Sequence, residues 1–158
     1  MNINKLIKII LCSIILFNGQ GVFADNKLLK NNIKNEIKKY GLFIDNYKEK
    51  PFHMTFDASK SPFPVTLGLQ ALSANNIKQC PDVLQDGREQ EFGKMKKIDT
   101  YNEYPIYLIP APKDSNLSDV LFSYKNKTCL GMYGSAGQKL TVEDKVRLSI
   151  LKVFIKSF

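Results

Sequence analysis

The chain has 158 residues, and its 23 lysine and arginine residues outnumber its 15 aspartate and glutamate residues, which gives a formal net charge of +8. A hydrophobic fraction of 44% is ordinary for a folded domain and too high for an intrinsically disordered chain. The single histidine excludes a metal site with two histidine ligands and a pair of histidines in acid–base catalysis.

The N-terminal segment 1–24 has the three parts of a secretory signal peptide. Lys5 and Lys8 give it a positive start, an apolar stretch follows at 9–17, and small residues precede a cleavage site after Ala24. This stretch is too short for a membrane anchor, which takes about 20 apolar residues. We therefore expect a periplasmic or secreted mature chain, residues 25–158, that folds as one domain without a transmembrane segment. The frequent Lys, Asn and Ile residues suggest a bacterial source.

Two cysteines, Cys80 and Cys129, remain in the mature chain after Cys12 leaves with the signal peptide. In an oxidising compartment they allow one intramolecular disulfide. Such a bridge closes a loop of about 50 residues, for which the chain-entropy model gives roughly 4 kcal/mol of stabilisation. The alternative is a catalytic thiol with His53 as its base, but an exported free thiol tends to oxidise.

The mature chain opens with a segment of helical periodicity between Asp25 and Tyr40. Apolar residues recur there as on one face of an amphipathic helix: Leu29, Ile33, Ile37 and Tyr40. Lysines occupy the opposite face, and Gly41 suits the left-handed position after the last turn. A lysine-rich face is usually only solvated, but the mature charge of +6 (21 − 15) also favours an anionic partner.

Five short stretches alternate in polarity or are apolar between prolines, as β-strands do: 52–56, 65–69, 106–109, 120–124 and 128–132. The last two form the clearest hairpin, with its turn at 125–127. Pro105 and Pro110 are expected to bound the third stretch, because proline does not suit a central strand. Residues 42–50 read as a connector with at most a short extended piece, and a short helix is expected near Ser73, ending before Pro81.

The C-terminal segment predicts a second long helix. Thr141 suits its N-cap, and the apolar residues from Val142 onward spread so widely around the helix that it must pack against a sheet. The order of elements predicts an α+β fold, in which an antiparallel sheet of about four to five strands packs one face against the N- and C-terminal helices, with one disulfide.

No set of residues with catalytic spacing is present. His53 faces away from the apolar side of its strand, towards solvent or a loop, and no positioned nucleophile accompanies it in the sequence. The glycine-rich segment Gly131 to Lys139 departs from the phosphate-loop spacing and favours a turn before a helix. The acidic residues lack ligand spacing, so we expect no metal and no cofactor. Whether His53 or the 131–139 segment has a role stays open.

These observations favour a small exported, non-catalytic binding protein that engages another protein, as an inhibitor, an immunity factor or a host-directed factor. The alternative is a binding module for anionic envelope components or a small ligand, with Lys94, Lys96 and Lys97 as candidate contacts. An enzyme with an unrecognised site is the third hypothesis, and a pocket that places His53 beside a serine, cysteine or carboxylate would support it. Nucleic acid is not an expected partner, because no recognition motif is present.

Overall fold

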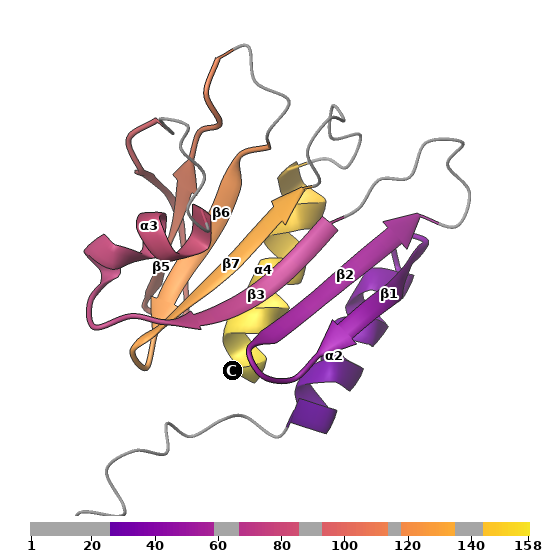
Figure 1. The fold of residues 1–158 in the computed structure, drawn as a ribbon. Coiled ribbons are helices and arrows are strands. Elements are labelled where there is room, and N and C mark those ends of the chain that lie inside the picture. The colour runs from indigo at the N-terminus through magenta and orange to yellow at the C-terminus, as the bar shows by residue number, and fades with distance from the viewer. Residues whose placement is uncertain (1–25, 59–66, 86–92, 114–117, 135–143) are drawn as a thin grey trace, which may run out of the picture.

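The computed structural model describes residues 26–58, 67–85, 93–113, 118–134 and 144–158 (Figure 1). The predicted signal peptide and its cleavage site after Ala24 lie outside these ranges. The described helices are α2 (Asn26–Lys38), the 3-10 turn η1 (Ile77–Gln79), α3 (Cys80–Gln85) and α4 (Asp144–Ser157). The described strands are β1 (Leu42–Lys48), β2 (Phe52–Ala58), β3 (Leu67–Ser73), β4 (Lys96–Tyr101), β5 (Tyr104–Ile109), β6 (Val120–Lys125) and β7 (Thr128–Gly134).

The described strands form one seven-stranded sheet in the order β1-β2-β3-β7-β6-β5-β4, and every neighbouring pair is antiparallel. Strands β1 to β3 make one meander and β4 to β7 a second. The pairing of β3 with β7 joins them into a continuous sheet. The α+β class is therefore confirmed.

The predicted count of four to five strands is wrong, because the alternation of apolar and polar residues is interrupted in the two edge strands, β1 and β4. In β1 the register shifts between Ile44 and Asn46, and in β4 it shifts between Lys97 and Asp99. An inserted residue breaks the period of two on which strand prediction depends. Irregular, charged edge strands are also a common protection against edge-to-edge pairing of sheets.

Two tight turns fix the second meander. Asn126 and Lys127 have φ values of 49° and 58°, and they close the predicted hairpin between β6 and β7. Asn102 and Glu103, with φ values of 44° and 68°, do the same between β4 and β5. Positive φ at both central residues matches the twist of the flanking strands.

Pro105 lies inside β5 rather than before it, contrary to the sequence expectation. It pairs with Thr100 near the start of the strand. Its carbonyl accepts a hydrogen bond from the Ser123 hydroxyl at 2.9 Å. A proline near the beginning of a strand is tolerated because few ladder bonds require its missing N–H.

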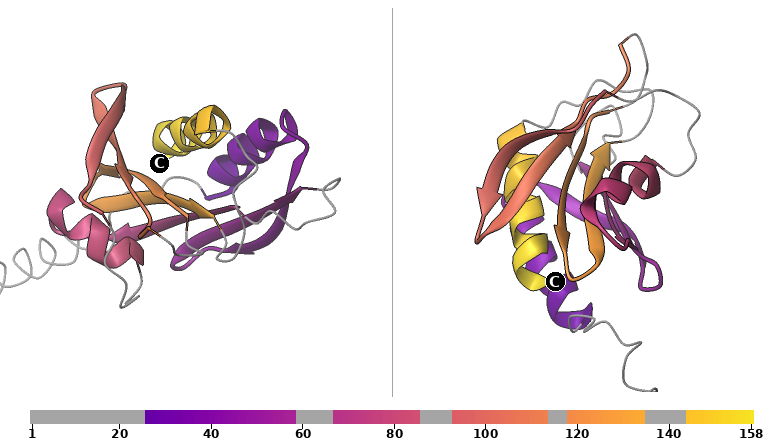
Figure 2. Two further views of the ribbon diagram at one scale, coloured as in Figure 1. Left: turned by 90° about the horizontal axis from the view of Figure 1, so that it is seen from above. Right: turned by 90° about the vertical axis from the view of Figure 1, so that its left-hand side faces the viewer.

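The terminal helices α2 and α4 lie together on one face of the sheet (Figure 2). Their apolar sides and that face of the sheet form the larger core, whose fully buried residues include Leu29, Ile33, Ile37, Met54, Phe56, Leu69, Met132, Ile150, Leu151 and Phe154. Tyr40 does not join them: α2 ends at Lys38, Gly41 turns the chain at φ +71°, and the tyrosine is 39% exposed.

A buried carboxylate connects these two helices. Glu36 of α2 is 7% exposed and accepts hydrogen bonds from Lys39 Nζ at 2.5 Å, Tyr40 Oη at 3.1 Å and Ser149 Oγ of α4 at 2.7 Å. Burial by itself would raise the pKa of Glu36, but the bonds from Lys39, Ser149 and Tyr40 outweigh it and hold the pKa below its ordinary value. Glu36 is therefore ionised at neutral pH and ties α2 to α4.

The third helix, α3, lies on the opposite face of the sheet and contacts β3 and β7 (Figure 2). The helix placement predicted from the sequence is therefore incomplete, since it put helices on one face only. The helix expected from Ser73 to before Pro81 is also misplaced. Ser73 ends β3, and α3 begins at Cys80 with Pro81 in its first turn, where a backbone N–H has no intrahelical partner.

The structure contains the disulfide that the cysteine count predicts. Cys80, at the start of α3, is bonded to Cys129 of β7, with their Cα atoms 5.5 Å apart. Both residues are fully buried in a second, smaller core together with Leu84, Val120 and Phe122. The bridge therefore fixes a short helix to the middle of the sheet. None of the helices in the described ranges has the length and apolarity needed to cross a membrane.

Candidate functional site

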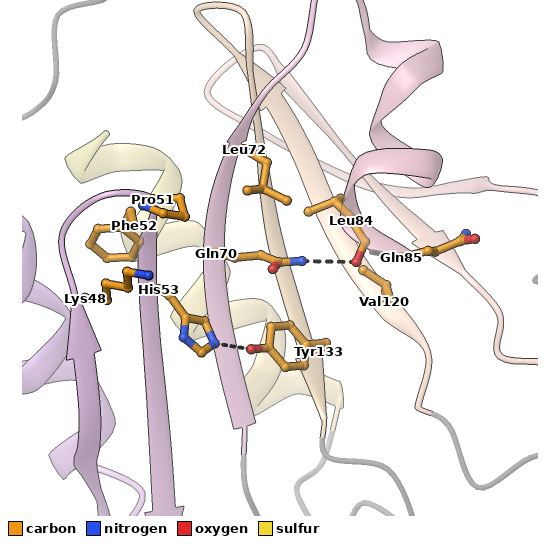
Figure 3. A pocket seen from close by; sticks show the side chains of 10 residues that line it. All are labelled: Lys48, Pro51, Phe52, His53, Gln70, Leu72, Leu84, Gln85, Val120 and Tyr133. Atoms are coloured by element: carbon orange, nitrogen blue, oxygen red, sulfur yellow. Dashed lines mark hydrogen bonds between the residues drawn. The ribbon is translucent and has the colours of Figure 1, made fainter. Parts of the chain in front are cut away.

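A pocket of about 360 Å³ lies on the face of the sheet that carries α3 (Figure 3). Its walls come from the β1–β2 turn, from β2, β3, β6 and β7, and from the end of α3. The volume falls within the usual range of small-molecule sites, about 300–1,000 Å³. We treat this pocket as the candidate site.

Strand register brings polar side chains from three strands to this face. Lys48 of β1 is the register partner of His53, and His53 is the partner of Gln70 on β3. Directly paired residues of antiparallel strands point to the same side of a sheet. The neighbours of His53 on β2, Phe52 and Met54, belong to the opposite core, in agreement with the direction that the sequence pattern gives for the histidine.

His53 and Tyr133 form a hydrogen-bonded pair across the sheet. The Nε2 atom of His53 bonds the phenolic oxygen of Tyr133, and the two rings are nearly parallel, at 2°, with centroids 6.0 Å apart. Tyr133 belongs to β7 and His53 to β2, so the tyrosine side chain crosses β3 to reach its partner (Figure 3).

Gly68 makes this crossing possible. It is the register partner of Tyr133, and a Cβ atom at position 68 would lie 2.6 Å from Tyr133 Oη and 2.7 Å from Tyr133 Cε1. These separations are shorter than van der Waals contact, so any side chain at position 68 would displace the ring. A glycine inside a strand often marks such a close approach.

The imidazole of His53 is neutral at pH 7. Its partial burial lowers its pKa below the ordinary value, and the nearby Lys48 ammonium lowers the pKa further. A neutral imidazole has one N–H donor and one acceptor nitrogen, while the tyrosine hydroxyl can donate or accept. His53 therefore enters the pair without formal charge.

The wall made by α3 is fixed in three ways. The Cys80–Cys129 disulfide holds the start of the helix, and the Gln70 side-chain amide donates a hydrogen bond to the Leu84 carbonyl at 3.1 Å at its end. The side chain of the same Leu84 packs so closely on Gly131 that a Cβ atom at position 131 would crowd its terminal methyl groups. The pocket therefore has a rigid wall, which reduces the entropy cost of binding.

The described lining is rich in hydrogen-bonding groups. It combines an ammonium, an imidazole, a phenol and two carboxamides with apolar walls, and within the described residues it holds no serine, cysteine or carboxylate beside His53. The hydroxyl that His53 contacts there is the phenol of Tyr133. The described residues also contain no group of three or more His, Cys, Asp or Glu side chains that could hold a metal ion.

The residues singled out in the sequence are spread over the molecule. Lys94, Lys96 and Lys97 are exposed on β4 and just before it, at the edge of the sheet opposite to β1, so they do not join the pocket. Cys80 and Cys129 lie behind the pocket wall. Of the 131–139 segment, Gly131 to Gly134 belong to β7, and the rest lies outside the described residues.

Sequence reasoning missed Tyr133, Gln70 and Lys48 as partners of His53. The available signal was the glycines within two strands, Gly68 and Gly131, since a strand glycine indicates that another group approaches the backbone. Comparisons of the chain with protein-family models, with curated proteins and with solved structures find no match.

Proposed function

We propose that the chain is a small exported binding protein without catalytic activity, and that it engages another protein as an inhibitor, an immunity factor or a host-directed factor does. The observation that supports this proposal is the pocketed face of the sheet. That face has a rigid helical wall and a row of hydrogen-bonding side chains, and helices α2 and α4 pack on the other side.

The composition of this face resembles that of a protein interface. On the same face, the far end of β1 presents Phe43, which is 46% exposed, and β1 and β2 add the polar side chains of Asn46, Thr55 and Lys48. Interfaces combine aromatic side chains with a polar rim, and they gain affinity when the binding groups are held in place before association. A flat surface of solvated lysines would lack both features.

Export is part of the proposal. It is supported by the signal-peptide pattern of residues 1–24 and by the disulfide, since disulfides persist in oxidising compartments. Mass spectrometry of the protein isolated from its natural source should show a chain that begins at Asp25 and contains no free thiol. A chain that begins at Met1, or free thiols at Cys80 and Cys129, would contradict export.

Affinity capture with the mature chain tests the binding proposal. We compare the wild type with Phe43→Ser on the pocketed face and with Leu28→Ser, a matched control on α2, where the leucine is 58% exposed. The proposal expects one stoichiometric partner that wild type and Leu28→Ser retain and Phe43→Ser loses. No stoichiometric partner, or equal capture by all three proteins, would count against it.

A second candidate function is attachment to an anionic envelope surface. It is favoured by the exposed lysines of the β4 edge, Lys94, Lys96 and Lys97. Sedimentation with vesicles of anionic lipid should then fall steeply as salt rises, and replacing the three lysines by glutamine should abolish it. Binding that is insensitive to salt or to these substitutions would leave the lysines with their other role, protection of the edge strand.

A further inference from the structure

The charges that line the pocket are of one sign. Lys48 is the one formally charged side chain among the described lining residues, and no aspartate or glutamate accompanies it there. The lysine is exposed, at the end of β1. Within the described residues it makes no ion pair. An ammonium group in this position is available to an incoming anion.

The ammonium and imidazole groups of the pocket lie on the side away from its leucine and valine side chains. Figure 3 shows Lys48 and His53, together with Pro51 and Phe52, on one side, and Leu72, Leu84 and Val120, together with Gln85, across from them. Gln70 and Tyr133 lie between the two sides. A ligand that fills this space needs a polar end and an apolar body.

The end of α3 is a less favourable place for a negative charge than the Lys48 side. The last carbonyls of a helix carry partial negative charge, which disfavours an anion beside Leu84. The side-chain amide of Gln70 already donates a hydrogen bond to the Leu84 carbonyl. An anion is therefore directed to the Lys48 side, where an ammonium and an imidazole can donate to it.

We propose that this pocket binds a carboxylate joined to an apolar body, with the carboxylate at Lys48 and His53 and the apolar body against Leu72, Leu84 and Val120. The inference rests on the proposed function, because it names the chemical group that the pocketed face recognises. Such a group is found at the C-terminus of a partner chain that ends in an apolar residue, and also in a small organic acid. A single ammonium suits the single charge of a carboxylate.

Titrations followed by backbone amide NMR test the proposal on the mature, disulfide-bonded chain. The probes are 3-phenylpropionate and its neutral amide, and a short peptide ending in phenylalanine with a free or an amidated C-terminus. The proteins are the wild type, Lys48→Met and a matched control, Lys34→Met, which removes an exposed lysine of α2.

The proposal expects saturable shifts around His53 and Tyr133 with a free carboxylate, and affinity at least about tenfold weaker for the neutral probes and for Lys48→Met. Lys34→Met should bind as the wild type does. Binding of the free peptide but not of phenylpropionate assigns the carboxylate to a partner chain, whereas binding of both admits a small acid. Equal affinity for charged and neutral probes, or no saturable shift at about 1 mM, would overturn the proposal.

Failure of this inference can be told apart from failure of the proposed function. If Phe43→Ser loses a captured protein partner while Lys48→Met retains it, and no carboxylate shifts the pocket resonances, the face binds protein by other contacts. If neither variant has a partner to lose but the carboxylate binds, the pocket is a small-molecule site.

Discussion

The ring of Tyr133 lies across the backbone of Gly68, so that a Cβ atom at position 68 would come within 2.6 Å of its hydroxyl oxygen. We predict that Gly68→Ala displaces the ring, breaks the bond to His53 and lowers the free energy of unfolding by about 1–3 kcal/mol, as overpacking does. Urea denaturation measures the loss. NMR titration of His53 should show its pKa returning towards the ordinary value as the ring leaves it exposed.

The matched control for this prediction is the Tyr133→Ala background. Without the ring, alanine at position 68 has no Tyr133 side chain to displace, so the cost of Gly68→Ala should shrink. A double-mutant cycle measures this coupling. An equal cost in both backgrounds would mean that the ring does not determine the need for glycine.

The single histidine of the chain gives stability a defined pH dependence. Because the folded pKa of His53 lies below 6.5, the unfolded chain binds the proton more strongly. The stability that this contributes is present above pH 6.5 and is lost as the pH falls towards and through the folded pKa. Urea denaturation at a series of pH values from 8 to 5 should show this decline in wild type and a flatter profile in His53→Gln. Identical profiles would refute the assignment.

Glu36 produces a second decline at lower pH. Its folded pKa lies below 4.5, so its contribution is present above that pH and is lost as the pH falls through the folded value. We predict that Glu36→Gln costs about 1–3 kcal/mol at neutral pH, because Lys39, Tyr40 and Ser149 lose a charged acceptor.

The control for Glu36 is Glu103→Gln, which changes an exposed glutamate in the β4–β5 turn. It should alter stability by less than about 0.5 kcal/mol, as surface substitutions usually do. If the two substitutions cost the same, the hydrogen bonds between α2 and α4 contribute little, and the carboxylate is only tolerated in its buried position.

Removal of the disulfide should be the most damaging of these changes. We expect the double variant Cys80→Ala, Cys129→Ala to lose about 2–5 kcal/mol, the usual range for a native bridge in a small domain. Reduced wild type should resemble the variant in urea denaturation. A loss below about 1 kcal/mol would indicate that α3 is held by Leu84 and Gln70 alone, whose contacts do not depend on the bridge.

The fold could be predicted from the sequence where local patterns are regular. The alternation in β2 and β7 and the apolar faces of α2 and α4 reflect burial against the larger core. The alternation of Val120, Phe122 and Tyr124 in β6 reflects burial in the smaller core, so these periods survive in the sequence. The edge strands β1 and β4 were not predicted, because Asp45 and Ile98 are inserted residues that break the period of two. The six-residue helix α3 was not predicted at its observed position, because contacts between residues distant in sequence hold it there. Among these contacts are the disulfide and the packing of Leu84 on Gly131.

The candidate site was predictable only in part, for a related reason. The direction of His53 follows from the pattern of β2 alone. Its partner Tyr133 is 80 positions away in the chain, and the contact depends on the pairing of β3 with β7. Local periodicity defines which side a residue faces, but it does not identify the strands that become neighbours.

The pairing of β3 with β7 sets Gly68 opposite Tyr133 and Leu72 opposite Cys129. If this pairing slipped by one residue, the side chains of the second meander would move to the other face of the sheet. Tyr133 and Cys129 would then contact the wrong neighbours. The same slip would turn Cys129 to the other face of the sheet, away from Cys80 and α3. The covalent link between the two cysteines therefore favours the native alignment of β3 with β7.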